Sequence, residues 1–315
     1  MMKAVVINRY GGNEVIDIRD VPLPSPGPKD VLIKVHAASV NPVDWKIRSG
    51  MTKILTGRTF PKILGSECAG EVAETGAEVT CFRGGEHVIG FPGIRRLSAF
   101  AEYVVVSQHN AFARPQTLTF EQASAMPVAG VTALQALRDL GHIKEGKKVL
   151  INGASGGVGH FAVQIAKVFN VHVTAVCSSP NADFVRNLGA DRVIRYDIED
   201  FTKEEKQYDI IFDAVTKRTF DECRRTLTER GIYVNTLPVF SVLLNQFFLG
   251  FFTRQKAASV MVRPNAADMN WMRTQIEKDK IRIVIDRIYP LEEIREAFAY
   301  SETGKARGKI ILKVL

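Results

Sequence analysis

The pattern of apolar and polar positions divides this chain into two kinds of sequence, and the change falls near Leu118. Before Leu118, short apolar or alternating runs are separated by glycine and proline residues, which end regular elements. Strands are expected at residues 3–8, 31–38, 70–74, 87–90 and 101–106. The pattern predicts a compact, mostly antiparallel β domain.

After Leu118, strand-like apolar runs alternate with segments of helix length. Strands are expected at residues 148–152, 172–177, 192–196, 208–215, 230–236 and 257–262, and helices at 158–169, 181–188, 217–228 and 266–279. This alternation predicts an α/β fold with a doubly wound parallel sheet and right-handed crossovers. The segment 120–137 is helical in composition, and Pro127 is expected to kink or divide it. A strand, a helix and a last strand follow at 282–288, 291–301 and 308–314.

A glycine-rich turn stands between the expected strand at 148–152 and the expected helix at 158–169. Its small residues Ala154, Gly156 and Gly159 follow the G-x-G-x-x-G spacing of dinucleotide-binding turns, with alanine in the first place. Strand, turn and helix together favour a nucleotide site over a plain structural turn. We expect the pyrophosphate to bind at the positive end of the helix. The residues of this expected site are Ala154, Ser155, Gly156, Gly157, Val158 and Gly159.

The composition is that of an ordinary globular protein large enough for two domains. The chain has 315 residues, of which 46% are hydrophobic and 24% charged, and its formal net charge is +8. The basic residues are scattered, so nucleic acid is not an expected partner. The positive charge is explained either by a solvated surface or by attraction of an anionic cofactor.

The cysteines suggest neither a disulfide framework nor a metal site. The four residues, at positions 68, 81, 177 and 223, lie far apart and form no C-x-x-C motif. Reduced thiols favour a cytoplasmic location. The N-terminal residues contain no signal-like apolar region, and the apolar stretch 240–252 is too short to span a bilayer, so no membrane contact is expected.

In its order of segments, essentially the whole chain resembles the medium-chain dehydrogenase/reductase superfamily, and within it the zinc-free quinone oxidoreductase-like branch. The motifs that carry the resemblance are HAASVNPVDWKIRSG (36–50), SAFAEYVVV (98–106), the run 126–136, INGASGGVGHFAVQIAK (151–167), NLGADRVIRY (187–196) and ARGKIIL (306–312). The resemblance implies a GroES-like substrate domain over 1–118 that is completed by 282–315. It also implies a Rossmann domain over 119–281, nicotinamide and substrate in the cleft between the domains, and a homodimer.

The residues after the expected strand at 172–177 favour NADPH as the cofactor. NAD enzymes place an acid there to bind the ribose 2′-hydroxyl. Here Ser178 and Ser179 follow the strand, and the next carboxylate in the chain is Asp183. A carboxylate repels a 2′-phosphate, whereas serine hydroxyls can donate hydrogen bonds to it.

The resemblance supports this preference, because it implies that Ser178 binds the 2′-phosphate and that Tyr196 contacts the same group. Relatives often carry lysine or arginine near position 180, where this chain has Pro180. Arg186 or Arg195 is then the expected substitute. An alternative role for the serines is to cap the helix that follows them.

Further cofactor contacts follow from the resemblance alone. They are Thr132, Asp213, Val215, Thr236, Leu237, Lys305, Ala306 and Arg307. Each also has a structural alternative, as a helix residue, a core residue or a surface charge.

No metal site is predicted. Zinc-dependent members of the superfamily bind zinc through a cysteine and the histidine of a Gly-His-Glu motif, followed by a later Cys or Asp. This chain has Pro42 and Val43 at the first place and Ser66 at the second, and the lobe with four structural cysteines is missing. Without a Lewis acid, alcohol oxidation loses its polarising group, which argues against the alternative of an alcohol or sugar dehydrogenase.

The remaining chemistry is hydride transfer from nicotinamide C4 to an electrophile of low energy, such as a quinone or an α,β-unsaturated carbonyl. The resemblance makes Asn41 the candidate polar group near substrate and nicotinamide. It places Trp45 where relatives often have a tyrosine, so the apolar wall remains without a phenol. The structural alternatives are an Asn-Pro turn and core packing.

Two further points stay open in the sequence. One alternative function is an NADPH-binding redox sensor or RNA-binding protein with little turnover, against which stands the lack of a basic stripe with interleaved aromatic residues. The aromatic segment 238–253 is expected to line the substrate pocket, cover the cleft or pack in a dimer interface.

Overall fold

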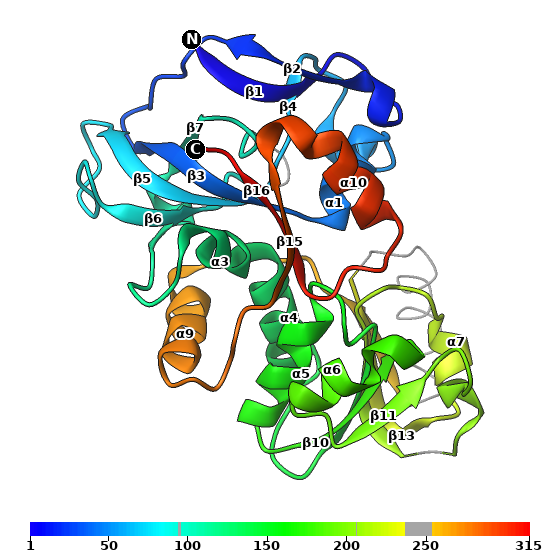
Figure 1. Cartoon of the computed structure of the whole chain (residues 1–315). Coiled ribbons are helices and arrows are strands. Elements are labelled where there is room, and N and C mark those ends of the chain that lie inside the picture. The colour runs from blue at the N-terminus through cyan, green and yellow to red at the C-terminus, as the bar shows by residue number, and fades with distance from the viewer. Residues whose placement is uncertain (94–95, 206, 237–253) are drawn as a thin grey trace. The chain divides into compact units, whose positions relative to one another are not determined.

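The computed structural model describes residues 1–93, 96–205, 207–236 and 254–315, and it divides into two compact units (Figure 1). The first unit consists of Met1–Val128, Pro264–Glu277 and Ile283–Leu315, and the second of Ala129–Arg263 and Lys278–Arg282. Helix α9 (Ala266–Glu277) therefore belongs to the first unit, whereas the expected division placed it in the second domain.

The first unit contains two β-sheets, and most of their pairings are antiparallel. Its seven-stranded sheet has the order β15-β16-β3-β5-β6-β8, and β7 also pairs with β3. These strands are β3 (Asp30–Val40), β5 (Cys68–Thr75), β6 (His87–Gly90), β7 (Tyr103–Ser107), β8 (Ala111–Ala113), β15 (Ile285–Pro290) and β16 (Lys309–Lys313). The smaller sheet has the order β2-β1-β4, from β1 (Met2–Ile7), β2 (Ile16–Val21) and β4 (Lys62–Ile63). The expectation of a GroES-like, mostly antiparallel domain is confirmed, although β2, β4 and β8 were not predicted.

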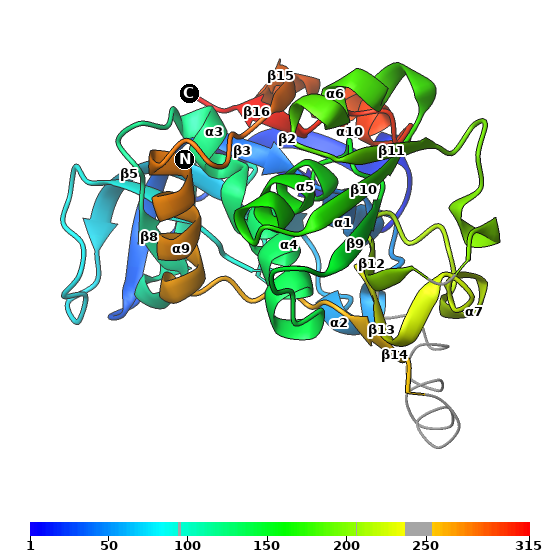
Figure 2. The same ribbon diagram turned by 90° about the horizontal axis from the view of Figure 1, so that it is seen from below.

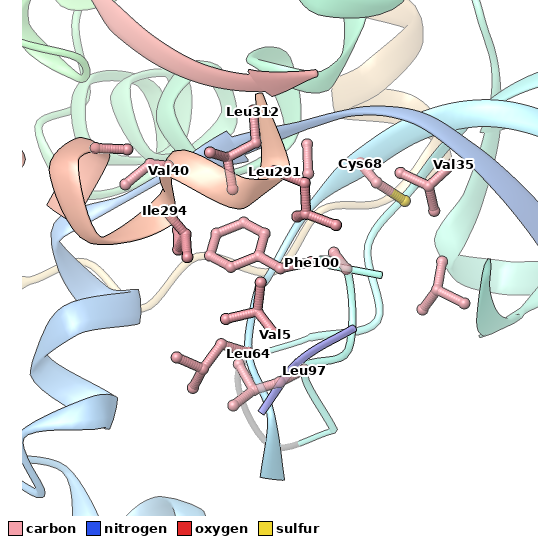
Figure 3. Packing of buried hydrophobic residues seen from close by; sticks show 14 of the residues in the cluster. Val5, Val35, Val40, Leu64, Cys68, Leu97, Phe100, Leu291, Ile294 and Leu312 are labelled. Atoms are coloured by element: carbon pink, nitrogen blue, oxygen red, sulfur yellow. The ribbon is translucent and has the colours of Figure 1, made fainter. Parts of the chain in front are cut away.

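The core of this unit forms around Phe100, whose side chain is fully buried. Figure 3 shows Phe100 among apolar side chains that come from distant parts of the chain, namely Val5, Leu64, Leu97, Leu291, Ile294 and Leu312. Gly65 passes against this ring with a φ of +99°, and a Cβ there would lie 2.5 Å from the Phe100 backbone nitrogen. Only glycine fits that position, which fixes the path of the chain just before Ser66 and Glu67.

Short helices complete the first unit. They are α1 (Pro42–Arg48), α2 (Lys53–Thr56), α3 (Phe120–Ser124) and α10 (Ile294–Glu302), with 3₁₀ turns at Asn13–Val15, Gln108–Asn110 and Leu291–Glu293. Helix α1 begins at a proline, whose missing N–H costs nothing at the first helical position. The Asn41 backbone N–H donates to the Asp44 carboxylate at 2.8 Å, which ties the start of the helix.

The second unit contains a six-stranded sheet in which every pairing is parallel, and Figure 2 labels its strands. Its order is β11-β10-β9-β12-β13-β14. The strands are β9 (Lys148–Asn152), β10 (His172–Cys177), β11 (Arg192–Arg195), β12 (Tyr208–Asp213), β13 (Leu227–Asn235) and β14 (Lys256–Ser259). This is the 3-2-1-4-5-6 order of a Rossmann sheet, and it confirms the predicted fold class.

The connections of the second unit follow the prediction except in one place. The helices are α4 (Val131–Gln135), α5 (Gly159–Val168), α6 (Ala182–Asn187) and α7 (Phe220–Cys223); π-helical turns lie at Met126–Gly130 and Ala136–Leu140, and 3₁₀ turns at Ser179–Asn181 and Phe201–Lys203. Pro127 divides the segment 120–137, as predicted. The helix expected at 217–228 is wrong in length. Helix α7 starts at Phe220, after its N-cap Thr219, and ends at Cys223, and β13 already pairs with β12 at Leu227. Among the described residues, no helix has the length and apolar character that a bilayer crossing needs.

Candidate nucleotide-binding site and buried polar cluster

The glycine turn of the second unit is held rigidly at the end of β9. Gly153 has a φ of +79°, which glycine adopts without strain. The N–H groups of Gly153 and Ala154 both donate to the Val176 carbonyl of β10, at 3.1 and 3.0 Å. The turn therefore starts at the carboxyl edge of the sheet, beside the point where the strand order reverses between β9 and β12.

Two glycines of the motif have different physical roles. A Cβ at Gly159 would lie 2.0 Å from the Gly153 carbonyl oxygen, so α5 packs against the turn with no room for a side chain. A Cβ at Gly156 would meet only the Gly153 oxygen, at 3.5 Å. The space beside Gly156 is thus open, as a closely approaching pyrophosphate requires.

The backbone donors at the start of α5 also fit a phosphate. Among the described residues, the N–H groups of Gly157, Val158 and Gly159 donate to no backbone carbonyl, and the first such bond runs from His160 to Gly156. Helix α5 has ten residues, so its positive end lies at these donors. An open space, free N–H groups and a helix dipole together fit the pyrophosphate of a dinucleotide.

Asn181 joins this turn to the segment after β10, and the sequence analysis missed it. Its side-chain amide donates to the Ser155 hydroxyl at 3.1 Å, and its backbone N–H donates to the Ser178 carbonyl at 2.9 Å. The Ser178 side chain makes no capping hydrogen bond to the 3₁₀ turn that follows it. Helix capping therefore does not explain why a serine stands at position 178. The only signal in the sequence was an asparagine shortly after a predicted strand.

The structure brings Ser178, Ser179 and Tyr196 to the same edge of the sheet. The Tyr196 backbone N–H donates to the Cys177 carbonyl at 3.0 Å, and the Tyr196 side chain is largely exposed. The next residue, Asp197, accepts a hydrogen bond from the Ser179 N–H at 2.9 Å. The Ser179 side chain, and then its N–H, hold the pKa of Asp197 below its ordinary value, so this carboxylate is ionised at neutral pH. An acid thus lies beside the serines although none follows them directly in the chain.

Asp213 at the end of β12 binds groups of the protein itself. It is fully buried and accepts hydrogen bonds from the Asn152 amide, the Val215 and Arg218 N–H groups and the Tyr233 hydroxyl. Burial raises the pKa of Asp213, and these hydrogen bonds oppose that rise. The carboxylate therefore locks β9, β12 and β13 together and supports the loop that carries Val215.

The other expected contacts of the second unit have different surroundings. Val215 packs on the glycine turn, since a Cβ at Gly153 would lie 2.5 Å from its Cγ1 atom. The Thr236 hydroxyl lies 3.1 Å from that of Thr216, next to the same loop, and Thr132 is almost completely buried in α4. Leu237 and the aromatic segment 238–253 lie outside the described residues.

The first unit contains a buried polar cluster that includes Asn41. The Glu67 and Lys309 side chains are 0% and 2% exposed, and Asn41 is also buried. The Lys309 ammonium donates to Asn41 Oδ1 at 2.6 Å and to Glu67 Oε1 at 3.1 Å. Glu67 Oε2 accepts from the Val128 N–H at 2.6 Å. A buried ion pair persists only when hydrogen bonds of this kind replace the lost water.

This cluster fixes the orientation of the Asn41 side chain. Its Nδ2 atom donates to Glu67 Oε1 at 2.7 Å and to the Ser39 carbonyl at 3.2 Å, so both amide hydrogens are engaged. The group left for a ligand is the second lone pair of Oδ1. Next to it, burial raises the pKa of Asp44 to about 7, against the effect of the Asn41 N–H and the Ser66 side chain.

Trp45 and the turn before β16 complete the expected sites of the first unit. Trp45 packs against the core, and its indole N–H has no acceptor among the described residues. Lys305, Ala306 and Arg307 lie between α10 and β16, where the Arg307 N–H donates to Asp286 at 3.2 Å.

The described residues include no group of three or more histidine, cysteine, aspartate or glutamate side chains that could hold a metal ion. Pro42 and Val43 form the start of α1, and Ser66 is buried beside Asp44. The Glu67 carboxylate forms its ion pair with the Lys309 ammonium.

A Rossmann sheet with an open glycine turn, joined in one chain to a GroES-like unit, defines a nicotinamide-dependent oxidoreductase. Residues 27–116 match the alcohol dehydrogenase GroES-like domain family, and residues 188–312 match the zinc-binding dehydrogenase family. The chain belongs to the quinone oxidoreductase-like branch of the medium-chain dehydrogenase/reductase superfamily.

The relatives match over nearly the full chain. The chloroplast envelope quinone oxidoreductase homolog of Arabidopsis thaliana is 35% identical over 99% of this chain and 98% of that protein. The mitochondrial NAD(P)H oxidoreductase RTN4IP1 of Mus musculus is 35% identical over 100% of this chain and 90% of that protein. The solved quinone oxidoreductase of Coxiella burnetii is 34% identical, with a TM-score of 0.93 over 100% of this chain and 99% of that one.

Proposed function

We propose that this protein is an NADPH-dependent, zinc-free reductase of quinones or α,β-unsaturated carbonyls. The observation that carries the proposal is the glycine turn, with open space beside Gly156 and free N–H groups at the start of α5. Quinone oxidoreductase relatives that match nearly the whole chain support the reaction class. The proposal includes a cytoplasmic location and a homodimer, as the sequence and the family resemblance suggest.

The preference for NADPH rests on Ser178 and Tyr196. The Ser178 hydroxyl caps no helix and is free to donate to a 2′-phosphate, and the exposed Tyr196 side chain lies at the same edge of the sheet. Hydrogen bonds to a charged phosphate are stronger than those between neutral groups. The glycine turn supplies the pyrophosphate contacts that NADPH and NADH share.

When bound, the nicotinamide supplies a hydride to the substrate. Asn41 is proposed to orient the nicotinamide, whose carboxamide N–H would donate to the free lone pair of Asn41 Oδ1, since Lys309 and Glu67 hold the Asn41 amide in one position. Trp45 is proposed to supply a flat apolar wall that positions the substrate, without the phenol that relatives often have there. Solvent then supplies the proton that completes the reduction of an enone.

The experiment that tests this function is a measurement of NADPH oxidation by metal-free protein with a panel of quinones, 2-alkenals and cyclic enones, repeated with NADH. Turnover that is faster with NADPH is the expected result. Tight NADPH binding without turnover would favour a sensor protein, and absence of nucleotide binding would remove the proposal. Alcohol-dependent formation of NADPH would favour a dehydrogenase instead.

A further inference from the structure

Asp197 is a carboxylate that the proposed function does not use, and it lies where the 2′-phosphate of NADPH is expected. Its Oδ1 atom accepts from the Ser179 N–H at 2.9 Å. Asp197 follows Tyr196, whose backbone N–H donates to the carbonyl of Cys177, the last residue of β10. Through this contact the edge strand β11 brings an acid to the end of β10, which is where NAD enzymes have their ribose-binding acid.

The neighbouring arginines offset this charge only in part, because each also has another carboxylate partner. Arg186 lies 2.6 Å from Asp183, and Arg195 lies 3.8 Å from Glu199. Together with Asp183, Glu199 and Asp197, these two arginines carry one net negative charge, and Arg195 also favours the ionised form of Asp197. Pro180 adds no cation where relatives often have one.

We propose that Asp197 sets the cofactor discrimination of this protein by opposing the 2′-phosphate and by occupying the Ser179 N–H. The preference for NADPH is therefore small, and NADH binds as well, with its ribose 2′-hydroxyl able to donate to the same carboxylate. This inference rests on the proposed function, since it concerns the nucleotide that the glycine turn binds.

The test is calorimetric binding of two probes, ADP-ribose and 2′-phospho-ADP-ribose, which differ only in the 2′-phosphate. The quantity measured is the ratio of their dissociation constants. Asp197→Asn keeps an oxygen acceptor for Ser179 and removes the charge, so the fold is retained. A single charge about 6 Å from a phosphate dianion changes affinity about tenfold at low salt, and screening reduces this change. We expect the ratio to shift about tenfold toward the phosphorylated probe, and to shift less as salt is added.

Matched variants separate this effect from a general change of charge. Asp197→Glu keeps the charge and is expected to keep the wild-type ratio. Asp221 is an exposed carboxylate of α7 that pairs with Arg224 at 3.8 Å. Asp221→Asn removes this charge and is also expected to leave the ratio unchanged.

Three results would overturn the inference. They are an unchanged ratio in Asp197→Asn, an equal shift in Asp221→Asn, and a shift that does not depend on salt. If wild-type protein binds neither probe, the proposed function fails and this inference fails with it. If both probes bind and only the ratio disagrees, the function stands and the role of Asp197 falls.

Discussion

Lys309 and Glu67 form an ion pair, 3.1 Å from nitrogen to oxygen, with both side chains withdrawn from solvent. Lys309 begins β16, and Glu67 directly precedes β5, so the pair joins segments that are far apart in the chain. Removing one partner leaves a buried charge without compensation, which typically costs about 3–5 kcal/mol. We expect Lys309→Met to lower the free energy of unfolding by about this amount, as measured by urea denaturation.

The double variant Lys309→Met with Glu67→Gln is expected to recover part of this loss, because it leaves no buried charge. Lys3→Met is a matched control at the exposed pair of Lys3 and Glu292, 2.7 Å apart, and should cost far less. Equal losses at the two lysines would contradict the role given to burial.

Asp44 makes stability depend on pH in an unusual direction. Its pKa rises from 3.8 to about 7 in the folded protein, so the folded state holds a proton that the unfolded state releases. The free energy of unfolding is then greatest below the pKa of the unfolded state, 3.8, and falls as pH rises toward about 7. The total fall is roughly 4 kcal/mol. Asp44→Asn should remove this slope, and unfolding measured between pH 5 and about 8 checks it. A parallel slope in the variant would exclude Asp44 as the cause.

The two glycines of the turn should separate binding from folding. Gly156→Ala adds a methyl group into open space, so we expect an unchanged melting temperature and at least about tenfold weaker binding of NADPH. Gly159→Ala forces a Cβ against the Gly153 carbonyl and should cost about 1–3 kcal/mol or more of stability. Thermal unfolding and calorimetry on both variants make the comparison. Weak binding with intact stability in both would show that Gly159 serves the ligand instead of the packing.

Ser178→Ala should weaken binding of 2′-phospho-ADP-ribose by about tenfold, because a hydrogen bond to a charged group is lost. ADP-ribose should bind as before, since it lacks the phosphate. The serine caps no helix, so the melting temperature should stay the same. Equal losses for both probes would mean that the hydroxyl supports the backbone and not the phosphate.

Local patterns predicted those parts of the molecule that depend on neighbours in the chain. The strand, turn and helix around Gly156 could be predicted because their pattern, an apolar run, a glycine turn and a segment of helix length, is local in the chain. The helix expected at 217–228 failed because β13 pairs with β12 from Leu227 onward, and strand pairing overrides helical composition.

The parts that escaped prediction depend on contacts between distant residues. Asn181 meets Ser155, and Asp197 meets Ser179, only because parallel strands bring their ends together. The pattern around Asn41 suggested a ligand group, but it gave no indication that Lys309 would engage the same amide. A single sequence contains these residues without stating which of them are neighbours.

The place of β16 in its sheet has a consequence for synthesis on the ribosome. This strand lies between β15 and β3, and it follows the whole parallel sheet in chain order. The strands of the parallel sheet are therefore available for pairing before the first sheet can close. Until β16 emerges, residues 37–40 of β3 lack this partner strand and Glu67 has no cation, so a nascent chain must keep that part of β3 from pairing with other strands.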